Sequence, residues 1–179
     1  MEKGFIVFDP SRCMGCKSCE IACAVEHSLS KNLYSAIMEY PRPKPRIRVF
    51  QVDNVKLPLT CRHCEEPPCV QVCPTGAMYR TEEGIVLNRP EKCIRCRLCV
   101  LVCPIAHPYV DPETRTLVKC DLCIHRLRQG KMPACVEACP TGALMYVTER
   151  ELAGERARMI SDVMVRMLEE FKKFRMSST

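Results

Sequence analysis

Cysteine dominates the sequence and limits what this chain can fold into. Sixteen of its 179 residues are cysteines, tryptophan is absent, and only five phenylalanines and five tyrosines occur. Large core-forming side chains are therefore scarce, so cross-links are expected to stabilise part of the fold. The cysteines fall into four groups of four: Cys13, Cys16, Cys19 and Cys23; Cys61, Cys64, Cys69 and Cys73; Cys93, Cys96, Cys99 and Cys103; Cys120, Cys123, Cys135 and Cys139.

The four groups are copies of one internal repeat. The first and third have the spacing C-x2-C-x2-C-x3-C, while the second and fourth widen one gap to four and eleven residues. Three groups end in Cys-Pro, and CPTGA occurs twice, starting at Cys73 and at Cys139, each time before a strand-like Met-Tyr pair. We expect three thiolates of each group to lie on one loop. A short helix then carries the fourth thiolate to another metal centre, and the proline ends that helix.

This spacing is typical of [4Fe–4S] ferredoxin loops, where the fourth cysteine of one run binds the cluster of another. Zinc is the alternative, but zinc ligands usually come as two separated pairs, which leaves the third closely spaced cysteine without a role. Disulfides need an oxidising compartment. The sequence has no evident secretory leader, twin-arginine pair or membrane-spanning apolar run, so we expect a cytoplasmic protein. The predicted cofactors are four [4Fe–4S] clusters.

The groups can exchange their fourth cysteines in two ways. In the nested arrangement, group two pairs with group three, its neighbour in the chain, and group one pairs with group four. In the alternative, group one pairs with group two and group three with group four, which would also give every cluster four ligands. The two CPTGA tails favour nesting, because they mark equivalent halves of two modules. Nesting predicts these ligands: Cys13, Cys16, Cys19 and Cys139 for cluster 1; Cys61, Cys64, Cys69 and Cys103 for cluster 2; Cys73, Cys93, Cys96 and Cys99 for cluster 3; Cys23, Cys120, Cys123 and Cys135 for cluster 4.

Longer stretches of the chain include CRHCEEPPCVQVCPTGAMY, CIRCRLCVLVCP and PACVEACPTGAL. From about residue 5 to 147 the sequence resembles the four-cluster iron–sulfur subunits of dimethyl sulfoxide reductase, formate dehydrogenase and hydrogenase complexes. The resemblance implies the nested pairing, two intertwined ferredoxin-like modules and electron transfer. Within that family, CMGCKSCEIACAVEHS is most similar to the iron–sulfur partner of anaerobic carbon monoxide dehydrogenase. One departure is Cys23-Ala24, which lacks the proline of the other groups.

The predicted fold is α+β, with two intertwined 2[4Fe–4S] ferredoxin-like modules, a β insert and a C-terminal amphipathic helix. A capping box, Thr148-x-x-Glu151, starts that helix, and apolar residues then recur at helical spacing. The helix either packs back on the modules or docks on a partner subunit. The predicted divisions are 1–30 with 104–147 for module A, 58–103 for module B, 31–57 for the insert and 148–179 for the helix.

Two connecting segments allow alternative interpretations. Within residues 31–57, the PRPKP stretch supplies prolines at 41, 43 and 45. Apolar residues then alternate at Ile47 and Val49, which predicts a strand or hairpin. This insert either covers a cluster or forms a docking arm. The basic segment 124–134 either lines a cluster or contacts a partner. The histidines are expected near the clusters or at the surface, since cysteines fill the ligand sets: His27, His63, His107 and His125.

The formal net charge of +6 raises the possibility of nucleic-acid binding. Four thiolate-bound clusters would change that charge to about −2, and aromatic stacking residues are scarce, so we exclude nucleic acid. Several basic residues adjoin the ligand loops, and they either face solvent or compensate cluster charge. They are Arg12, Lys17, Arg62, Lys92, Arg95, Arg97 and Lys119.

The sequence contains no glycine-rich nucleotide loop and no metal ligand beyond those needed for the clusters. We therefore predict a non-catalytic protein that relays single electrons through four clusters. The resemblance implies carbon monoxide dehydrogenase as the enzyme partner, with an acceptor such as a hydrogenase. Membrane association would then be peripheral, through a partner. The alternatives are a subunit of formate dehydrogenase or formate–hydrogen lyase, and a free ferredoxin-like carrier.

Overall fold

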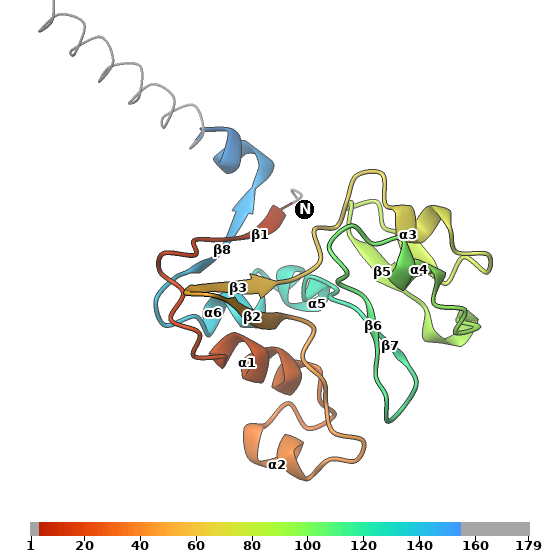
Figure 1. Ribbon diagram of the computed structural model, residues 1–179, viewed down its shortest axis with the longest axis horizontal. Helices are drawn as coiled ribbons and strands as arrows, with labels where there is room; N and C mark the ends of the chain where they lie inside the picture. Colours follow the sequence, from red (N-terminus) through yellow and green to blue (C-terminus); the bar gives the residue numbers. More distant parts are fainter. Residues whose placement is uncertain (1–3, 155–179) are drawn as a thin grey trace, which may run out of the picture.

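The computed structural model describes residues 4–154. Within this range the chain forms eight short strands, paired in four two-stranded antiparallel sheets and joined by short helices (Figure 1). The mixed helix and strand composition expected from the sequence is confirmed. No sheet is large enough to organise the fold, so the helices and sheets gather around the cysteine loops.

The two ends of the described chain form one lobe. Strand β1 (Gly4–Phe8) pairs with β8 (Leu144–Thr148), and Ile6 lies opposite Tyr146 in this register. Helices α1 (Ser18–Glu26) and α6 (Ala134–Glu137) pack against each other beside this sheet. The first and fourth cysteine groups therefore lie in one lobe.

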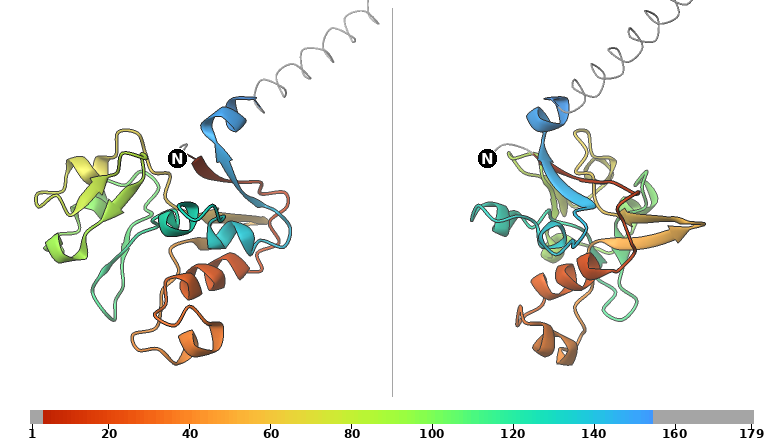
Figure 2. Two further views of the ribbon diagram at one scale, coloured as in Figure 1. Left: turned by 180° about the vertical axis from the view of Figure 1, so that it is seen from behind. Right: turned by 90° about the vertical axis from the view of Figure 1, so that its left-hand side faces the viewer.

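The middle of the chain forms a second lobe. Helix α3 (Pro68–Gln71) packs against α4 (Leu98–Leu101), and β4 (Met78–Arg80) pairs with β5 (Val86–Asn88). Each CPTGA segment leads into a strand, β4 here and β8 in the first lobe. In Figure 1 and in the rear view of Figure 2 the two lobes lie on opposite sides, with α5 (Ile124–Leu127) between them.

Two hairpins extend from this pair of lobes. The insert contains α2 (Leu33–Met38) and a hairpin of β2 (Arg48–Val52) with β3 (Val55–Leu59). The hairpin expected in the insert is therefore present, and it continues two residues beyond the predicted boundary at 57. A second hairpin, β6 (Tyr109–Val110) with β7 (Leu117–Val118), was not predicted.

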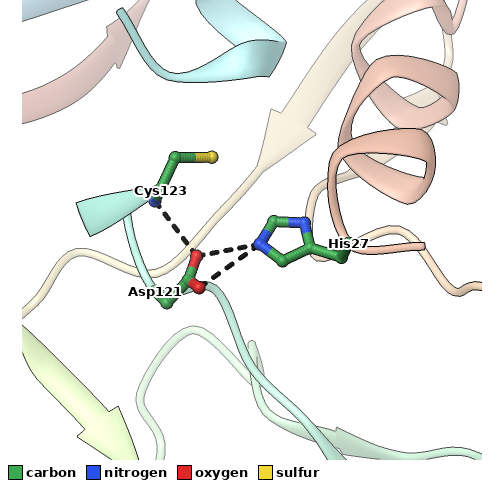
Figure 3. Close-up of side chains that lie close together, drawn as sticks. All are labelled: His27, Asp121 and Cys123. Atoms are coloured by element: carbon green, nitrogen blue, oxygen red, sulfur yellow. Dashed lines mark hydrogen bonds and ion pairs between the residues drawn. The ribbon is translucent and has the colours of Figure 1, made fainter. Parts of the chain in front are cut away.

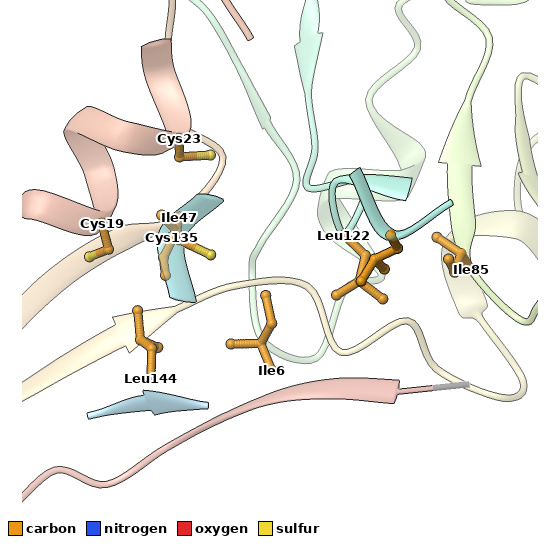
Figure 4. Packing of buried hydrophobic residues seen from close by; sticks show 9 residues of the cluster. Ile6, Cys19, Cys23, Ile47, Ile85, Leu122, Cys135 and Leu144 are labelled. Atoms are coloured by element: carbon orange, nitrogen blue, oxygen red, sulfur yellow. The ribbon is translucent and has the colours of Figure 1, made fainter. Parts of the chain in front are cut away.

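The main buried cluster contains nine residues, and three of them are the cysteines Cys19, Cys23 and Cys135 (Figure 4). Ile47 and Leu122 are each only 1% exposed, and they anchor the insert and the fourth cysteine group in this core. Thiols thus occupy positions that aliphatic side chains fill in most cores. The shortage of large apolar residues is compensated at the cysteine sites.

The capping box at the end of β8 is confirmed. The Thr148 hydroxyl accepts from the Glu151 N–H at 3.3 Å, and the Glu151 carboxylate accepts from the Thr148 N–H at 2.8 Å. Residues 149–154 are helical, and the rest of the predicted helix, 155–179, lies outside the described residues. Within 4–154, no helix is long and apolar enough to cross a membrane.

Candidate metal centres

Three cavities are each lined by four cysteines, three from one group and the fourth from another. We name them by the cluster numbers of the nested prediction. Site 1 is lined by Cys13, Cys16, Cys19 and Cys139; site 2 by Cys61, Cys64, Cys69 and Cys103; site 3 by Cys73, Cys93, Cys96 and Cys99.

The remaining four cysteines form site 4, the most enclosed set. Cys23, Cys120, Cys123 and Cys135 are all buried. Burial raises the pKa of Cys135, and the neighbouring thiols of Cys120, Cys23 and Cys123 raise it further. Those four thiols therefore lie close enough to interact. All sixteen cysteines fall within the described range, and none of them forms a disulfide.

The same backbone geometry shapes the start of every ligand loop. The residue two positions after the first cysteine has a positive φ in each group: Gly15 (75°), His63 (48°), Arg95 (60°) and Leu122 (57°). Only Gly15 adopts this conformation without steric cost, so the other three hold a left-handed conformation that costs roughly 1 kcal/mol or more. Left-handed turns of this kind point successive backbone N–H groups into a concavity that suits an anionic cluster.

The two CPTGA segments place the same donors on equivalent sulfurs. The Met78 N–H donates to Cys73 Sγ at 3.4 Å, and the Leu144 N–H donates to Cys139 Sγ at 3.5 Å. Burial raises the pKa of both thiols, but these N–H groups and the hydroxyl two residues after each cysteine outweigh it and lower both pKa values. The Ala24 that replaces proline after Cys23 leaves that cysteine in a longer helix, α1.

Backbone N–H groups also reach sulfurs in the other parts of the sites. His63 donates to Cys61 Sγ at 3.4 Å, and Leu122 donates to Cys120 Sγ at 3.3 Å, both within the left-handed turns. Donors of this type stabilise thiolates and raise the potential of a bound cluster. The remaining bonds run from the His107 N–H to Cys103 Sγ at 3.4 Å and from the Arg46 N–H to Cys23 Sγ at 3.2 Å.

Burial opposes ionisation of several thiols. It raises the pKa of Cys19 and Cys69 to about 11 and the pKa of Cys123 to about 12. These environments alone keep the sulfur protonated, and a bound cation is what removes the proton from a coordinating thiol. Four-thiol sets with N–H donors facing their sulfurs fit the [4Fe–4S] group that the spacing predicts.

The hairpins cover two of the sites. Val49 of β2 and Pro58 of β3 line site 1, and the Val49 N–H donates to the Glu20 carboxylate of α1. Val110 of β6 and Leu117 of β7 line site 3 in the other lobe. The β2–β3 hairpin of the insert therefore serves as a structural cover. The β6–β7 hairpin, which the prediction assigned to module A, covers a site of the second lobe.

His27, Asp121 and Cys123 lie close together, with their potential ligand atoms within 4.8 Å of one another (Figure 3). Asp121 Oδ1 accepts from His27 Nε2 at 3.1 Å and from the Cys123 N–H at 3.0 Å, and Oδ2 pairs with the Arg46 guanidinium at 2.6 Å. Burial raises the pKa of Asp121, but these partners hold it well below its usual value. The group ties the site 4 loop to α1 and to the start of the insert.

The segment 124–134 is a helix and turn, which fits the lining interpretation. Arg126 pairs with Glu26 of α1 at 2.7 Å and with Glu137 of α6, and His125 reaches the same Glu26 at 2.8 Å. These contacts join three helices around site 4. His63 and His107 are buried between the lobes, 2% and 6% exposed, where the sequence allowed either a surface position or one near the clusters.

Comparison with known protein families agrees with the geometry. The family described as a 4Fe-4S dicluster domain matches residues 52–150, and the one described as a 4Fe-4S binding domain matches residues 10–26. The first match extends over more than half of the chain and contains the second, third and fourth cysteine groups. The second match contains the first group.

Three curated relatives are each 39% identical to this chain. One component of the anaerobic dimethyl sulfoxide reductase of Escherichia coli aligns over 80% of this chain and 72% of its own length. The thiosulfate reductase electron transfer subunit PhsB of Salmonella typhi aligns over 79% of this chain and 73% of its own length. One component of the tetrathionate reductase of Salmonella typhimurium aligns over 77% of this chain, which spans 55% of that relative.

The family matches and relatives confirm two predictions. The protein is a non-catalytic iron–sulfur electron-transfer protein, as expected from the absence of a nucleotide loop or spare ligands in the sequence. Its sixteen cysteines hold four [4Fe–4S] clusters. The chain belongs to the 4Fe-4S dicluster domain family of ferredoxin-like iron–sulfur proteins.

Proposed function

We propose that this protein is the electron-transfer subunit of a multi-subunit reductase and relays single electrons between that enzyme's catalytic subunit and an external donor. The observation that carries this proposal is the set of four sites, each with four cysteines and no open position. A cluster with every iron bound to a thiolate has no site for substrate, so it serves as a one-electron carrier. The relatives named for dimethyl sulfoxide, thiosulfate and tetrathionate reductases supply the enzyme class.

We assign the cluster ligands by the nested pairing. The cavities of sites 1, 2 and 3 support it, because each contains three cysteines of one group and the fourth cysteine of its nested partner. Contacts between α1 and α6, and between α3 and α4, support it in the same way. The corresponding division is module A, 1–30 with 104–147, and module B, 58–103.

The sites are arranged in the order 1, 4, 2, 3. Helix α1 carries Cys19 to site 1 and Cys23 to site 4, so these two sites are neighbours. Burial raises the pKa of Cys120, and the nearby Cys61 thiol raises it further, which supports neighbouring positions for sites 4 and 2. Sites 2 and 3 exchange cysteines between groups two and three. Electrons would then cross the molecule in three short steps.

Exposure of the cysteines supports sites 1 and 3 as the two ends of this relay. Cys16 of site 1 and Cys96 of site 3 are the exposed cysteines, and the apolar neighbours Met14 and Ile94 are 64% and 63% exposed. The cysteines of site 2 are half-buried, and those of site 4 are buried. Electrons would therefore enter at one of the outer sites and leave at the other, where partner subunits can approach closely.

Carbon monoxide dehydrogenase is a second candidate partner, with a hydrogenase as the electron acceptor. It is favoured by the first cysteine group, whose CMGCKSCEIACAVEHS stretch is most similar to the iron–sulfur partner of that enzyme. The two candidates predict opposite directions of electron flow. A reductase would withdraw electrons from the relay, whereas a carbon monoxide dehydrogenase would supply them. A cytoplasmic location is compatible with both.

Native co-purification followed by redox spectroscopy tests these proposals. Under anaerobic conditions, we expect the protein to co-elute with a large redox enzyme. Dimethyl sulfoxide, thiosulfate or tetrathionate should then oxidise the reduced clusters, and carbon monoxide should leave them unchanged. Reduction by carbon monoxide would favour the second candidate. Elution as a free monomer that exchanges electrons with several enzymes would contradict both and favour a free carrier.

Cysteine substitutions test the nested pairing separately. Cys13→Ser and Cys139→Ser should alter the same cluster signal in electron paramagnetic resonance spectra, because both residues belong to site 1. Cys93→Ser should alter a different signal, that of site 3. If Cys139→Ser instead matched Cys93→Ser, the assignment would be wrong while the electron-transfer function would stand.

A further inference from the structure

One of the seven basic residues beside the ligand loops differs from the others in its position. Lys119 is 2% exposed and ranks among the largest fully buried side chains. Lys92 occupies the equivalent place in the repeat, directly before the first cysteine of its group, but it is exposed. The other five are also exposed: Arg12, Lys17, Arg62, Arg95 and Arg97.

The Lys119 ammonium donates its hydrogen bonds to uncharged backbone carbonyls. Nζ donates to the Val86 carbonyl at 2.6 Å and to the Cys120 carbonyl at 2.7 Å. None of the ion pairs found within residues 4–154 includes Lys119. Burying an ammonium without a counter-charge costs several kcal/mol. Since no Asp or Glu side chain among the described residues pairs directly with this ammonium, a nearby anionic group of another kind would offset the cost.

The two buried histidines beside Lys119 supply no negative charge. His63 Nδ1 accepts a hydrogen bond from the Val86 N–H at 3.1 Å, and His107 Nε2 accepts from the Cys120 N–H at 3.0 Å. A ring nitrogen that accepts an N–H carries no proton, so both imidazoles are neutral. Neutral imidazoles carry no charge that could compensate the ammonium.

The position of Lys119 points to the thiolates as its counter-charge. Its side chain lines the site 2 cavity together with Cys61, Cys69 and Cys103. Its backbone directly precedes Cys120, the first ligand of site 4. Lys119 thus adjoins both site 2 and site 4.

We propose that Lys119 is a shared internal counter-cation of the clusters at sites 2 and 4, and that it raises the reduction potential of both. The proposal rests on the four-cluster function above. Reduction adds one negative charge to a cluster, and a nearby cation in a low-dielectric interior stabilises the reduced state. One buried charge would thereby raise the potentials of both middle carriers together.

Redox titration of Lys119→Gln tests this role. Two of the four cluster signals should shift to lower potential, each by at least a tenfold change in the reduction equilibrium, which is 59 mV for one electron. The shifted signals should be those altered by Cys61→Ser and Cys120→Ser. Lys92→Gln is the matched control, and solvent should screen its charge, so its shifts should be much smaller. Equal shifts in the two variants, or no shift in Lys119→Gln, would overturn the proposal.

A second comparison covers the case in which Lys119→Gln loses its clusters. Iron content would then be measured in Lys119→Arg, which keeps the charge, and in Lys119→Met, which keeps only the volume. Iron retained by the Arg variant and lost by the Met variant supports a counter-cation, and loss from both overturns it. A wild-type protein with fewer than four cluster signals would instead overturn the electron-relay function.

Discussion

Substitution of Asp121 by Asn should destabilise the loop that carries site 4. The carboxylate pairs with Arg46 at 2.6 Å and accepts from His27 at 3.1 Å, while the two paired side chains of Asp121 and Arg46 are only 21% and 29% exposed. Asn retains the shape and one acceptor, but it loses the charge. A bond to a charged group contributes about 1.5–3 kcal/mol, and partial exposure places this loss near 2 kcal/mol. That free energy corresponds to roughly thirtyfold in a rate.

The rate of cluster loss measures this effect, because a cofactor-bound protein does not unfold in a reversible two-state manner. Anaerobic unfolding in guanidinium chloride would be followed by the decay of visible cluster absorbance. Glu83→Gln is the control, since it breaks an ion pair with Arg128 of similar length, 2.7 Å, whose guanidinium is 60% exposed. We expect about thirtyfold faster decay in the Asp121 variant and less than about threefold in the control. Equal rates in the two variants would refute the reasoning.

Three further predictions concern the loops and the core. Gly142→Ala and Gly76→Ala should accelerate cluster loss to a similar extent, because both glycines have a φ near +60°. The atom nearest a Cβ at Gly142 is the end of the exposed Arg12 side chain, at 3.0 Å, which can move aside. Unchanged cluster loss in both variants would contradict this. Leu122→Ala should destabilise the folded protein by about 3 kcal/mol, since the Leu122 side chain is 1% exposed. Leu101 is 78% exposed, so Leu101→Ala should have little effect. Similar unfolding rates in the two variants would argue against the packing described. Iron removal by a chelator should abolish most tertiary structure, seen as loss of near-ultraviolet circular dichroism, and a native-like apoprotein would contradict that coupling.

The sequence predicted the elements that depend on local spacing. Short helices were predicted at the three-residue gap before the fourth cysteine of each group, and strands were predicted after the CPTGA segments, where β4 and β8 lie. Both predictions depend on local sequence, because three close cysteines and a following proline determine the local backbone. The insert hairpin also followed from alternation at Ile47 and Val49. These signals are contained within a few residues of the elements they predict.

The features that the sequence did not predict depend on contacts far apart in the chain. Strand β1 pairs with β8 at the other end of the described residues, and its short apolar run gave no indication of that partner. The β6–β7 hairpin has strands of two residues each, too short for a periodic pattern. Lys92 and Lys119 precede cysteines in equivalent positions, and only the packing of the two lobes buries one of them.

The central claim is that the sixteen cysteines hold four cubane clusters. Anaerobically purified protein should contain about sixteen irons and about sixteen acid-labile sulfides per chain, with negligible zinc. Stoichiometric zinc, or an iron content below about twelve per chain with a matching deficit of sulfide, would contradict the account.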